Sequence, residues 1–181
     1  MKSRARPQPS ARNLTRRHFV IGRAGRVSRA VAVKKILVPL DFSDYSNAAL
    51  CWALSFAEQF RARLILLYVA ETIPAGSELG ACHLPQLEAD LRKIGRKQLS
   101  RIKKSEIPPG IASQCLIRAG KADAEIVETA KSLNVDLIVM AAHSHGSQHG
   151  QLGSTCERVT RFAPCPVLLV PAHEQTVPFF L

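Results

Sequence analysis

Short apolar runs alternate with helix-like stretches along residues 34–170, and this alternation constrains the fold more than any other feature. Five runs of strand length are rich in isoleucine, leucine and valine: Lys34–Phe42, Leu64–Val69, Ser113–Ala119, Asp136–Ala142 and Pro166–Val170. Four intervening stretches carry apolar residues at helical spacing: Ala48–Phe60, Leu84–Lys104, Ala122–Leu133 and Ser154–Phe162. Strands separated by helices pair in parallel through right-handed crossovers. We therefore expect an α/β protein with an open five-stranded parallel sheet and helices on both faces.

The first two helical stretches have apolar faces that predict how they pack. Ser43 and Asp44 offer side-chain oxygens that can cap the start of the first helix. Its periodic apolar residues are Ala49, Trp52, Ala53, Phe56 and Phe60. Those of the second helix are Leu87, Leu91, Ile94, Leu99 and Ile102. Lysines and arginines occupy the opposite side of the second helix, which is typical of a solvated surface.

Basic residues are concentrated at the start of the chain. Residues 1–35 hold 11 lysines and arginines and no acidic residue, so the other residues carry 14 basic and 14 acidic side chains. Residues 1–33 have too little periodic apolar surface to fold alone, and we expect a disordered leader. A nucleic-acid-binding arm, a transit peptide and a functionless extension remain open for it. We expect the folded domain over residues 34–172 and a tail over residues 173–181.

Cysteine usage and hydropathy narrow the cellular setting. The five cysteines are scattered and form no Cys-x-x-Cys pair, which indicates free thiols in a reducing cytoplasm rather than a zinc or redox site. No apolar run reaches the roughly 18–20 residues that a membrane span needs. The expected location is therefore the cytoplasm, without membrane association.

In an open parallel sheet, ligands bind at the carboxyl ends of the strands where the strand order reverses. Asp41 follows the first predicted strand, Val69 ends the second, and Gly120 ends the third. These three positions are expected to converge at one edge of the sheet. They make that edge the candidate binding site.

A Gly-Ser-Thr turn supplies the fourth part of this predicted site. Gly153, Ser154 and Thr155 close the loop after the fourth strand and open the last helix. Glycine permits close backbone approach, and free amides with hydroxyl groups can bind an anion. Serine and threonine are also ordinary helix caps, so the turn by itself does not prove a phosphate site.

The same loop is rich in histidine. His143, His145 and His149 could bind a metal ion together with Cys156 or Asp41. Imidazoles in a polar loop are more often plain surface groups, and we expect no metal site.

Three blocks of the chain resemble the universal stress protein family: KKILVPLDFSDYSNAAL, AGKADAEIVETAKSLNVDLIVM and LGSTCERVTRFAPCPVLLVP. The resemblance covers about Lys34–Ala172. It implies a Rossmann-like sheet of the adenine-nucleotide alpha-hydrolase type with strand order 3-2-1-4-5. It also implies a homodimer joined through the last strand, here Val167–Val170, whose apolar edge would otherwise be unpaired.

Members of that family divide into ATP binders and non-binders, and the binders carry Gly-x-x-Gly, nine residues, then Gly-Ser/Thr. After Met140 this chain has Ala141 and Ser144 at the two glycine positions, and only eight residues separate Ser144 from Gly153. A side chain at Ser144 is unfavourable if the family's glycine has a positive φ. The resemblance implies that Asp41 contacts adenosine, Val69 lines the adenine pocket, and the Gly-Ser-Thr turn holds phosphates. The full set of expected nucleotide-binding residues is Asp41, Val69, Gly120, Met140, Ala141, Ser144, Gly153, Ser154 and Thr155.

Enzyme motifs are absent from the sequence. There is no glycine-rich dinucleotide turn after the first strand, no Walker lysine and no acidic metal cluster. We therefore expect a non-enzymatic or very slow nucleotide-binding regulator that uses ATP, with Mg²⁺, as its ligand. The alternatives are a nucleotide-free module that binds unknown proteins through the same fold, and a nucleic-acid-associated protein that uses residues 1–33.

Overall fold

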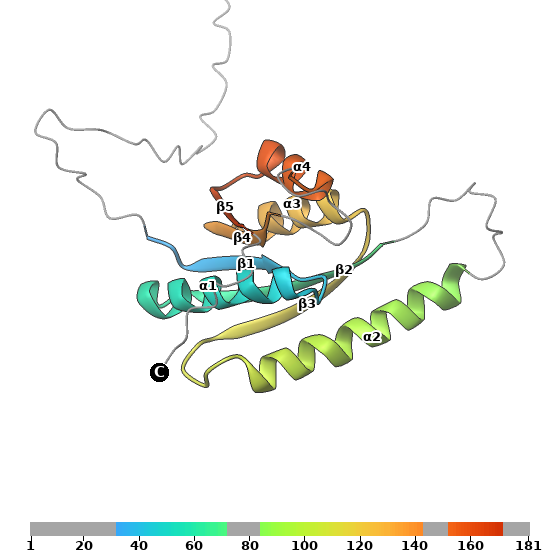
Figure 1. Cartoon of the computed structure of the whole chain (residues 1–181), viewed down its shortest axis with the longest axis horizontal. Coiled ribbons are helices and arrows are strands. Elements are labelled where there is room, and N and C mark those ends of the chain that lie inside the picture. Colours follow the sequence, from blue (N-terminus) through green and yellow to red (C-terminus); the bar gives the residue numbers. More distant parts are fainter. Residues whose placement is uncertain (1–31, 72–83, 143–151, 172–181) are drawn as a thin grey trace, which may run out of the picture. The chain divides into compact units, whose positions relative to one another are not determined.

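Strands and helices alternate through the part of the chain that the structure describes, which is residues 32–71, 84–142 and 152–171 of a computed structural model (Figure 1). The chain separates into two units, residues 1–31 and 32–181, and every described residue belongs to the second. Its elements are β1 Lys35–Pro39, α1 Asp44–Phe60, β2 Arg63–Glu71, α2 Leu84–Ser105, β3 Ser113–Gly120, α3 Ala122–Ser132, β4 Leu137–Ala141, α4 Ser154–Phe162 and β5 Val167–Val170.

These strands form one sheet in the order β3-β2-β1-β4-β5, with every neighbouring pair parallel. The predicted fold class and strand order are both confirmed. Helices α1 and α2 cover one face of the sheet, and α3 and α4 cover the other. The strand order reverses at β1: β2 and β3 are added on one side of it, and β4 and β5 on the other.

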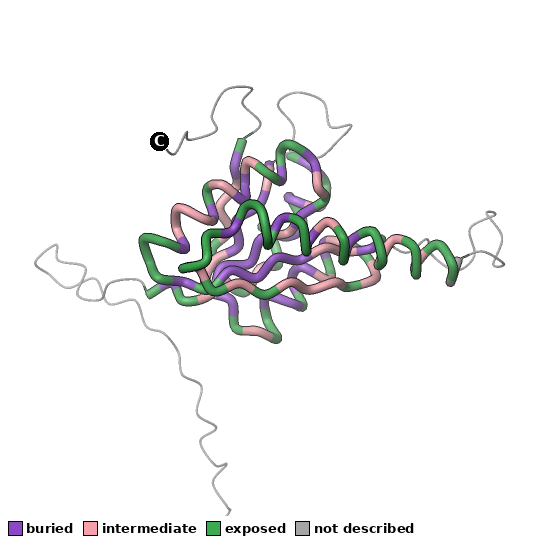
Figure 2. Tube along the Cα trace, turned by 90° about the horizontal axis from the view of Figure 1, so that it is seen from below, coloured by how far each residue is buried: buried purple, intermediate pink, exposed green. Residues whose placement is uncertain are grey.

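The core consists of two apolar layers separated by the sheet. Ile36 and Val38 of β1 belong to the layer under α1 and α2, and Leu37 between them belongs to the layer under α3 and α4. Because both faces are covered, the strands are continuous apolar runs rather than alternating ones. Figure 2 shows this burial concentrated along the central strands.

The face predicted for α2 is only partly buried. Leu99 and Ile102 are in the core, but Leu87 is 45% exposed and Ile94 is 52% exposed. Figure 1 shows the start of α2, where Leu87 lies, extending beyond the strands. Ile94 directly precedes Gly95, the residue that contacts Tyr68 of β2, and is turned away from that contact. Helical periodicity identified the helix correctly but overestimated how much of it packs.

The face predicted for α1 differs in a similar way. The residues packed on the sheet are small, with Ala49, Ala53 and Ala57 fully buried, whereas Trp52 is 39% exposed and Phe60 is 41% exposed. The alanines let the helix backbone approach the strands closely, and this places the aromatic residues on a flank. Trp52 and Phe60 were therefore wrongly included in the packing face, whereas Phe56 is partly buried against the core.

Within residues 32–71, 84–142 and 152–171, no helix combines the length and the apolar character that a membrane crossing requires.

Candidate functional site

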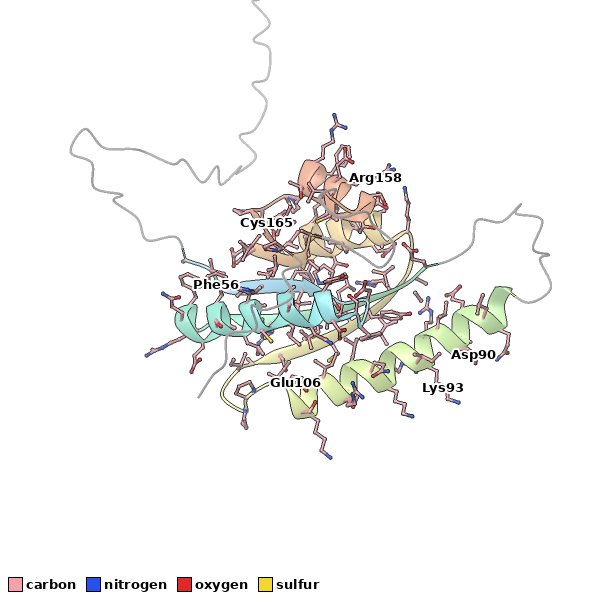
Figure 3. All side chains as sticks on the ribbon, viewed as in Figure 1. Phe56, Asp90, Lys93, Glu106, Arg158 and Cys165 are labelled. Atoms are coloured by element: carbon pink, nitrogen blue, oxygen red, sulfur yellow. The ribbon has the colours of Figure 1, made fainter. Side chains whose placement is uncertain are left out.

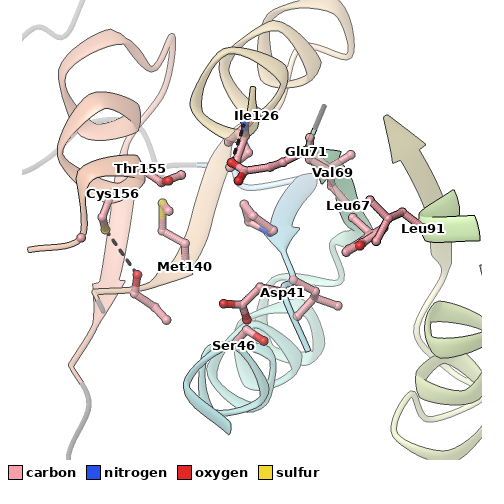
Figure 4. Close-up of a pocket in the computed structure, with 16 residues that line it drawn as sticks. Asp41, Ser46, Leu67, Val69, Glu71, Leu91, Ile126, Met140, Thr155 and Cys156 are labelled. Atoms are coloured by element: carbon pink, nitrogen blue, oxygen red, sulfur yellow. Dashed lines mark hydrogen bonds between the residues drawn. The ribbon is translucent and has the colours of Figure 1, made fainter. Parts of the chain in front are cut away.

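A pocket of about 430 Å³ opens at the carboxyl ends of β1, β2 and β4, where the direction of the crossovers reverses (Figure 4). This is the position at which open parallel sheets bind ligands. Besides the strand ends, all four helices contribute to it: α1, α3 and α4 near their starts, and α2 through its first half. Its lining residues are Pro39, Leu40, Asp41, Ser46, Leu67, Tyr68, Val69, Glu71, Leu91, Ala122, Ile126, Met140, Ala141, Gly153, Thr155 and Cys156.

The pocket walls are mainly apolar. Leu67 and Val69 of β2 face it together with Met140 of β4, and Ile126 of α3 and Leu91 of α2 add further apolar surface (Figure 4). Such a wall suits a flat, weakly polar ring, because small-molecule sites are mostly apolar with a few placed polar groups.

Asp41 supplies one of those polar groups and is held by the start of α1. Its Oδ1 accepts hydrogen bonds from the Ser43 amide at 3.0 Å and from the Ser43 hydroxyl at 2.6 Å. Ser43 in turn caps α1 by accepting from the Ser46 amide at 3.1 Å. Two effects act on the pKa of this solvent-accessible carboxylate. Partial burial, taken alone, would raise the pKa. The hydrogen bonds from Ser43, with a smaller one from Ser46, outweigh this effect and leave the pKa of Asp41 below 3.8.

A strained residue fixes this turn. Phe42 has φ +67°, a left-handed conformation that is uncommon for a bulky side chain. Its ring stacks on Tyr68 of the pocket wall, with ring centroids 4.8 Å apart. Strain of this kind persists only where surrounding contacts hold it, and here it sets the direction of the backbone at Asp41.

The start of α4 forms the other polar end of the pocket. Gly153 is the N-cap and offers no side-chain cap, so no capping side chain competes for the first amides of the helix. The Gly153 amide donates to Ala142 O at 3.1 Å, and the Cys156 thiol donates to Ala141 O at 3.3 Å, which ties the helix start to the end of β4. Thr155 lines the pocket from this helix. The positive end of the α4 dipole therefore lies at the pocket and can attract an anion.

A carboxylate at the end of β2 was not predicted from the sequence. Glu71 lines the pocket, and its Oε1 accepts from the Ala122 amide at the start of α3, at 3.4 Å. The side chain thus joins the end of β2 to α3. The sequence did hold a signal for Glu71: it comes two residues after Val69, and alternation along a strand places residues two apart on the same side of the sheet.

The predicted site residues divide into three groups. Those that the structure brings to the pocket are Asp41, Val69, Met140, Ala141, Gly153 and Thr155. Gly120 lies beside Glu71 at the end of β3, where its φ of +145° and the nearby Glu125 side chain exclude a Cβ, and it does not line the pocket. Ser154 is exposed and also does not line it. Ser144 lies outside the described residues.

The histidine-rich loop cannot be placed in the same way. His143, His145 and His149 all lie outside the described residues. Among the residues that are described, no group of three or more histidine, cysteine or acidic side chains is arranged to hold a metal ion.

Other lining residues were missed because they come from distant parts of the chain. Leu91 reaches the pocket from α2. Tyr68 was predicted only as part of a strand, and Cys156 only as part of a helix and as a possible metal ligand. No local motif marks them. Only the packing of α2 and α4 against the strand ends brings them together.

Comparisons with known proteins agree with this architecture. The model of the universal stress protein family matches residues 32–171. A universal stress protein of Methanocaldococcus jannaschii is 33% identical over 138 residues, which is 76% of this chain and 81% of that protein. The solved structure of universal stress protein UspA from Lactobacillus plantarum is 27% identical with a TM-score of 0.63, covering 78% of this chain and 99% of that one.

A universal stress protein solved in complex with cAMP is 24% identical, with a TM-score of 0.53 and coverage of 77% of this chain and 97% of that one. At this identity the likeness shows the fold alone.

Proposed function

This chain belongs to the universal stress protein family, and we propose that its pocket binds an adenine nucleotide, ATP with Mg²⁺ being the expected form. The observation that supports this is the convergence of Asp41, the apolar wall and the start of α4 in one cavity. A universal stress protein of the same fold was solved in complex with cAMP, which supports the proposal.

The chemistry of the pocket fits the parts of such a ligand. An adenine ring would lie against Val69 and Met140, and the Asp41 carboxylate would accept a hydrogen bond from the adenosine moiety. Phosphates would bind at the start of α4, where the amides that follow Gly153 and the Thr155 hydroxyl group are available. No lysine or arginine lines the described part of the pocket, so amides and a bound cation would balance the phosphate charge.

The expected role is regulation rather than turnover. Among the described lining residues, Asp41 has a lowered pKa and is held by hydrogen bonds, which makes it a poor general base at neutral pH. Occupancy would then bias the assembly or the partners of the protein. The proposed assembly is a homodimer through β5, and the proposed location is the cytoplasm, in keeping with described cysteines that are all free.

Thermal unfolding of the full chain with and without Mg-ATP tests the proposal, with AMP and buffer as references. A ligand at about 100 times its dissociation constant stabilises the folded state by roughly 2.7 kcal/mol. Each kcal/mol raises the midpoint by about 2–4 °C for a domain of this size. A clear rise in the unfolding midpoint is therefore expected with a nucleotide and not with buffer alone.

A pair of charge variants in α4 makes the test specific. Thr155→Glu places a carboxylate at the proposed phosphate end, and Thr160→Glu adds the same charge at an exposed position later in the helix. Thr155→Glu is expected to abolish the shift and Thr160→Glu to retain it. If the parent shows no shift with any nucleotide, the nucleotide proposal is wrong and a protein-binding role through the same fold takes its place.

A further inference from the structure

The aromatic flank of α1 is an apolar surface outside the nucleotide pocket. Trp52, Phe56 and Phe60 follow one another at intervals of four residues, and we call these three residues the aromatic stripe. Their rings are in sequence, with centroids 6.2 Å apart for the first pair and 6.0 Å apart for the second. Trp52 is 39% exposed and Phe60 is 41% exposed, and Phe56 between them is partly buried. Large aromatic groups side by side at a surface indicate an interaction site rather than chance exposure.

The aromatic stripe lies on the side of α1 that faces the β5 edge of the sheet. Cys51 marks the other side: burial and then the charge of Glu106, just after α2, raise the pKa of its thiol. Phe60 follows Cys51 by about two and a half helical turns, which places it on the opposite flank. Helix α2 packs on β2 and β3, whereas α1 also contacts β4 and β5, so the flank away from α2 points to β5. Figure 3 shows Phe56 on this side of α1.

Strand β5 contacts α1, the helix that carries this surface. All strands are parallel, so β5 ends at Val170 on the edge of the sheet at which α1 begins. Residues 172–181 include Val177, Phe179, Phe180 and Leu181. When extended they can span about 33 Å, whereas the 17 residues of α1 cover about 25 Å. The segment is therefore long enough to follow the whole aromatic stripe.

We propose that residues 172–181 turn back at the end of β5 and bind their apolar side chains to the aromatic stripe of the same chain. Since β5 ends on the side of the sheet at which α1 begins, the apolar residues at the end of the segment would reach Phe56 and Phe60 when it runs antiparallel to β5. When the phenylalanines of the segment pack against the rings of the aromatic stripe, large apolar areas are removed from water and the rings contact one another. The segment then shields the flank of α1 beside the strand through which the dimer is proposed to form.

Trp52 is the single tryptophan of the chain, so its fluorescence reports on this surface directly. In the full chain, Phe179→Ser combined with Phe180→Ser is expected to shift the emission to longer wavelength. Acrylamide quenching should rise about twofold, because the covering rings would be lost. His173→Ser combined with Gln175→Ser changes the same segment without removing apolar groups and should leave both readouts unchanged.

A stripe variant and the protein concentration complete the test. Phe60→Ser should give a similar shift, and combining it with the Phe179/Phe180 variant should add little more, since coupled residues are not additive. Thermal unfolding of each variant identifies any change that comes from loss of the fold. Emission that is unchanged by the Phe179/Phe180 variant would overturn the proposal. The proposal would also be overturned if Trp52 of the parent protein became unshielded on dilution, because a second copy of the chain would then be what covers it.

Discussion

Asp41 shows how a single side chain serves both the fold and the site. Its Oδ1 accepts two hydrogen bonds from Ser43 and thereby supports the start of α1, and its carboxylate lies in the pocket. These bonds are stronger to the ionised form, which is why the pKa in the folded protein lies below 3.8 despite the opposing effect of burial. A group with a depressed folded pKa stabilises the protein above the unfolded pKa, and this contribution is lost as the pH falls through the folded value.

Asp41→Asn is therefore expected to lower the free energy of unfolding at neutral pH, with a smaller difference from the parent as the pH falls below 3.8. Urea denaturation from about pH 7 to about pH 3 measures this difference. Glu58→Gln removes a charge from an exposed position of the same helix and serves as the control. If the difference in unfolding free energy between Asp41→Asn and the parent does not change with pH, the lowered pKa assigned to Asp41 is wrong.

Two thiols at the sheet edge should be unreactive. Burial raises the pKa of Cys156 to about 11, and burial with the nearby Asp136 charge raises that of Cys165 to about 11. At pH 8 this leaves roughly one hundredth of the thiolate of an ordinary cysteine, so alkylation should be about 100-fold slower than in the unfolded chain. Peptide-resolved mass spectrometry after iodoacetamide treatment measures the rates. Nucleotide should slow Cys156 further but not Cys165, because only Cys156 lines the pocket.

At the scale of the element, α2 depends on one close approach to β2. Gly95 is buried, and a Cβ built there would lie 2.3 Å from Tyr68 Cδ1. The ring of Tyr68 is itself stacked on Phe42 and lines the pocket. This contact sets how closely the helix approaches, and Leu91 reaches the pocket one turn earlier along the same helix.

Gly95→Ala should destabilise the protein by up to about 2 kcal/mol. The overpacking cost of about 1–3 kcal/mol exceeds the gain of up to about 1 kcal/mol in helix propensity. Gly110→Ala is the matched control: nothing lies within 4 Å of a Cβ at that position, so it should be neutral or slightly stabilising. Chemical denaturation measures both. Equal stability of the two variants would show that α2 can move away from Tyr68 at no cost.

At the scale of the whole molecule, the proposed dimer depends on the open edge of β5. Pro166 O and Val170 O accept from the β4 side, from Ile138 N at 3.0 Å and Ala142 N at 2.8 Å. Alternation along a strand then directs the amides of Val167 and Leu169 toward the open edge. An exposed row of such groups is available for pairing with another strand.

Leu169→Pro removes one outward amide while leaving the hydrogen bonds to β4 in place, and it is expected to convert a dimer to a monomer. Leu169→Ala keeps the amide and should remain dimeric, which separates the backbone effect from the loss of the side chain. Sedimentation equilibrium gives the masses. A parent that is already monomeric would contradict the dimer proposal, and a dimeric Leu169→Pro would place the interface elsewhere.

The sequence by itself determined the order and type of every described element, because apolar periodicity and turn residues are local properties. It also located Asp41, Val69 and Gly153, because the end of a parallel strand is readable from the chain. It did not predict the exposed positions of α2 or the aromatic flank of α1, which depend on where the sheet ends beneath each helix.

Only the tertiary structure decided which side chains share the pocket. Leu91, Glu71 and Cys156 come from three elements that are far apart in the chain, and no local pattern relates them. The left-handed Phe42 is also a tertiary feature, since stacking on Tyr68 holds a conformation that the residue would rarely adopt alone. Periodicity determines which helices and strands form. The distance between packed elements depends on residue size at the contact, as where Gly95 lets α2 approach Tyr68, and that distance shapes the site.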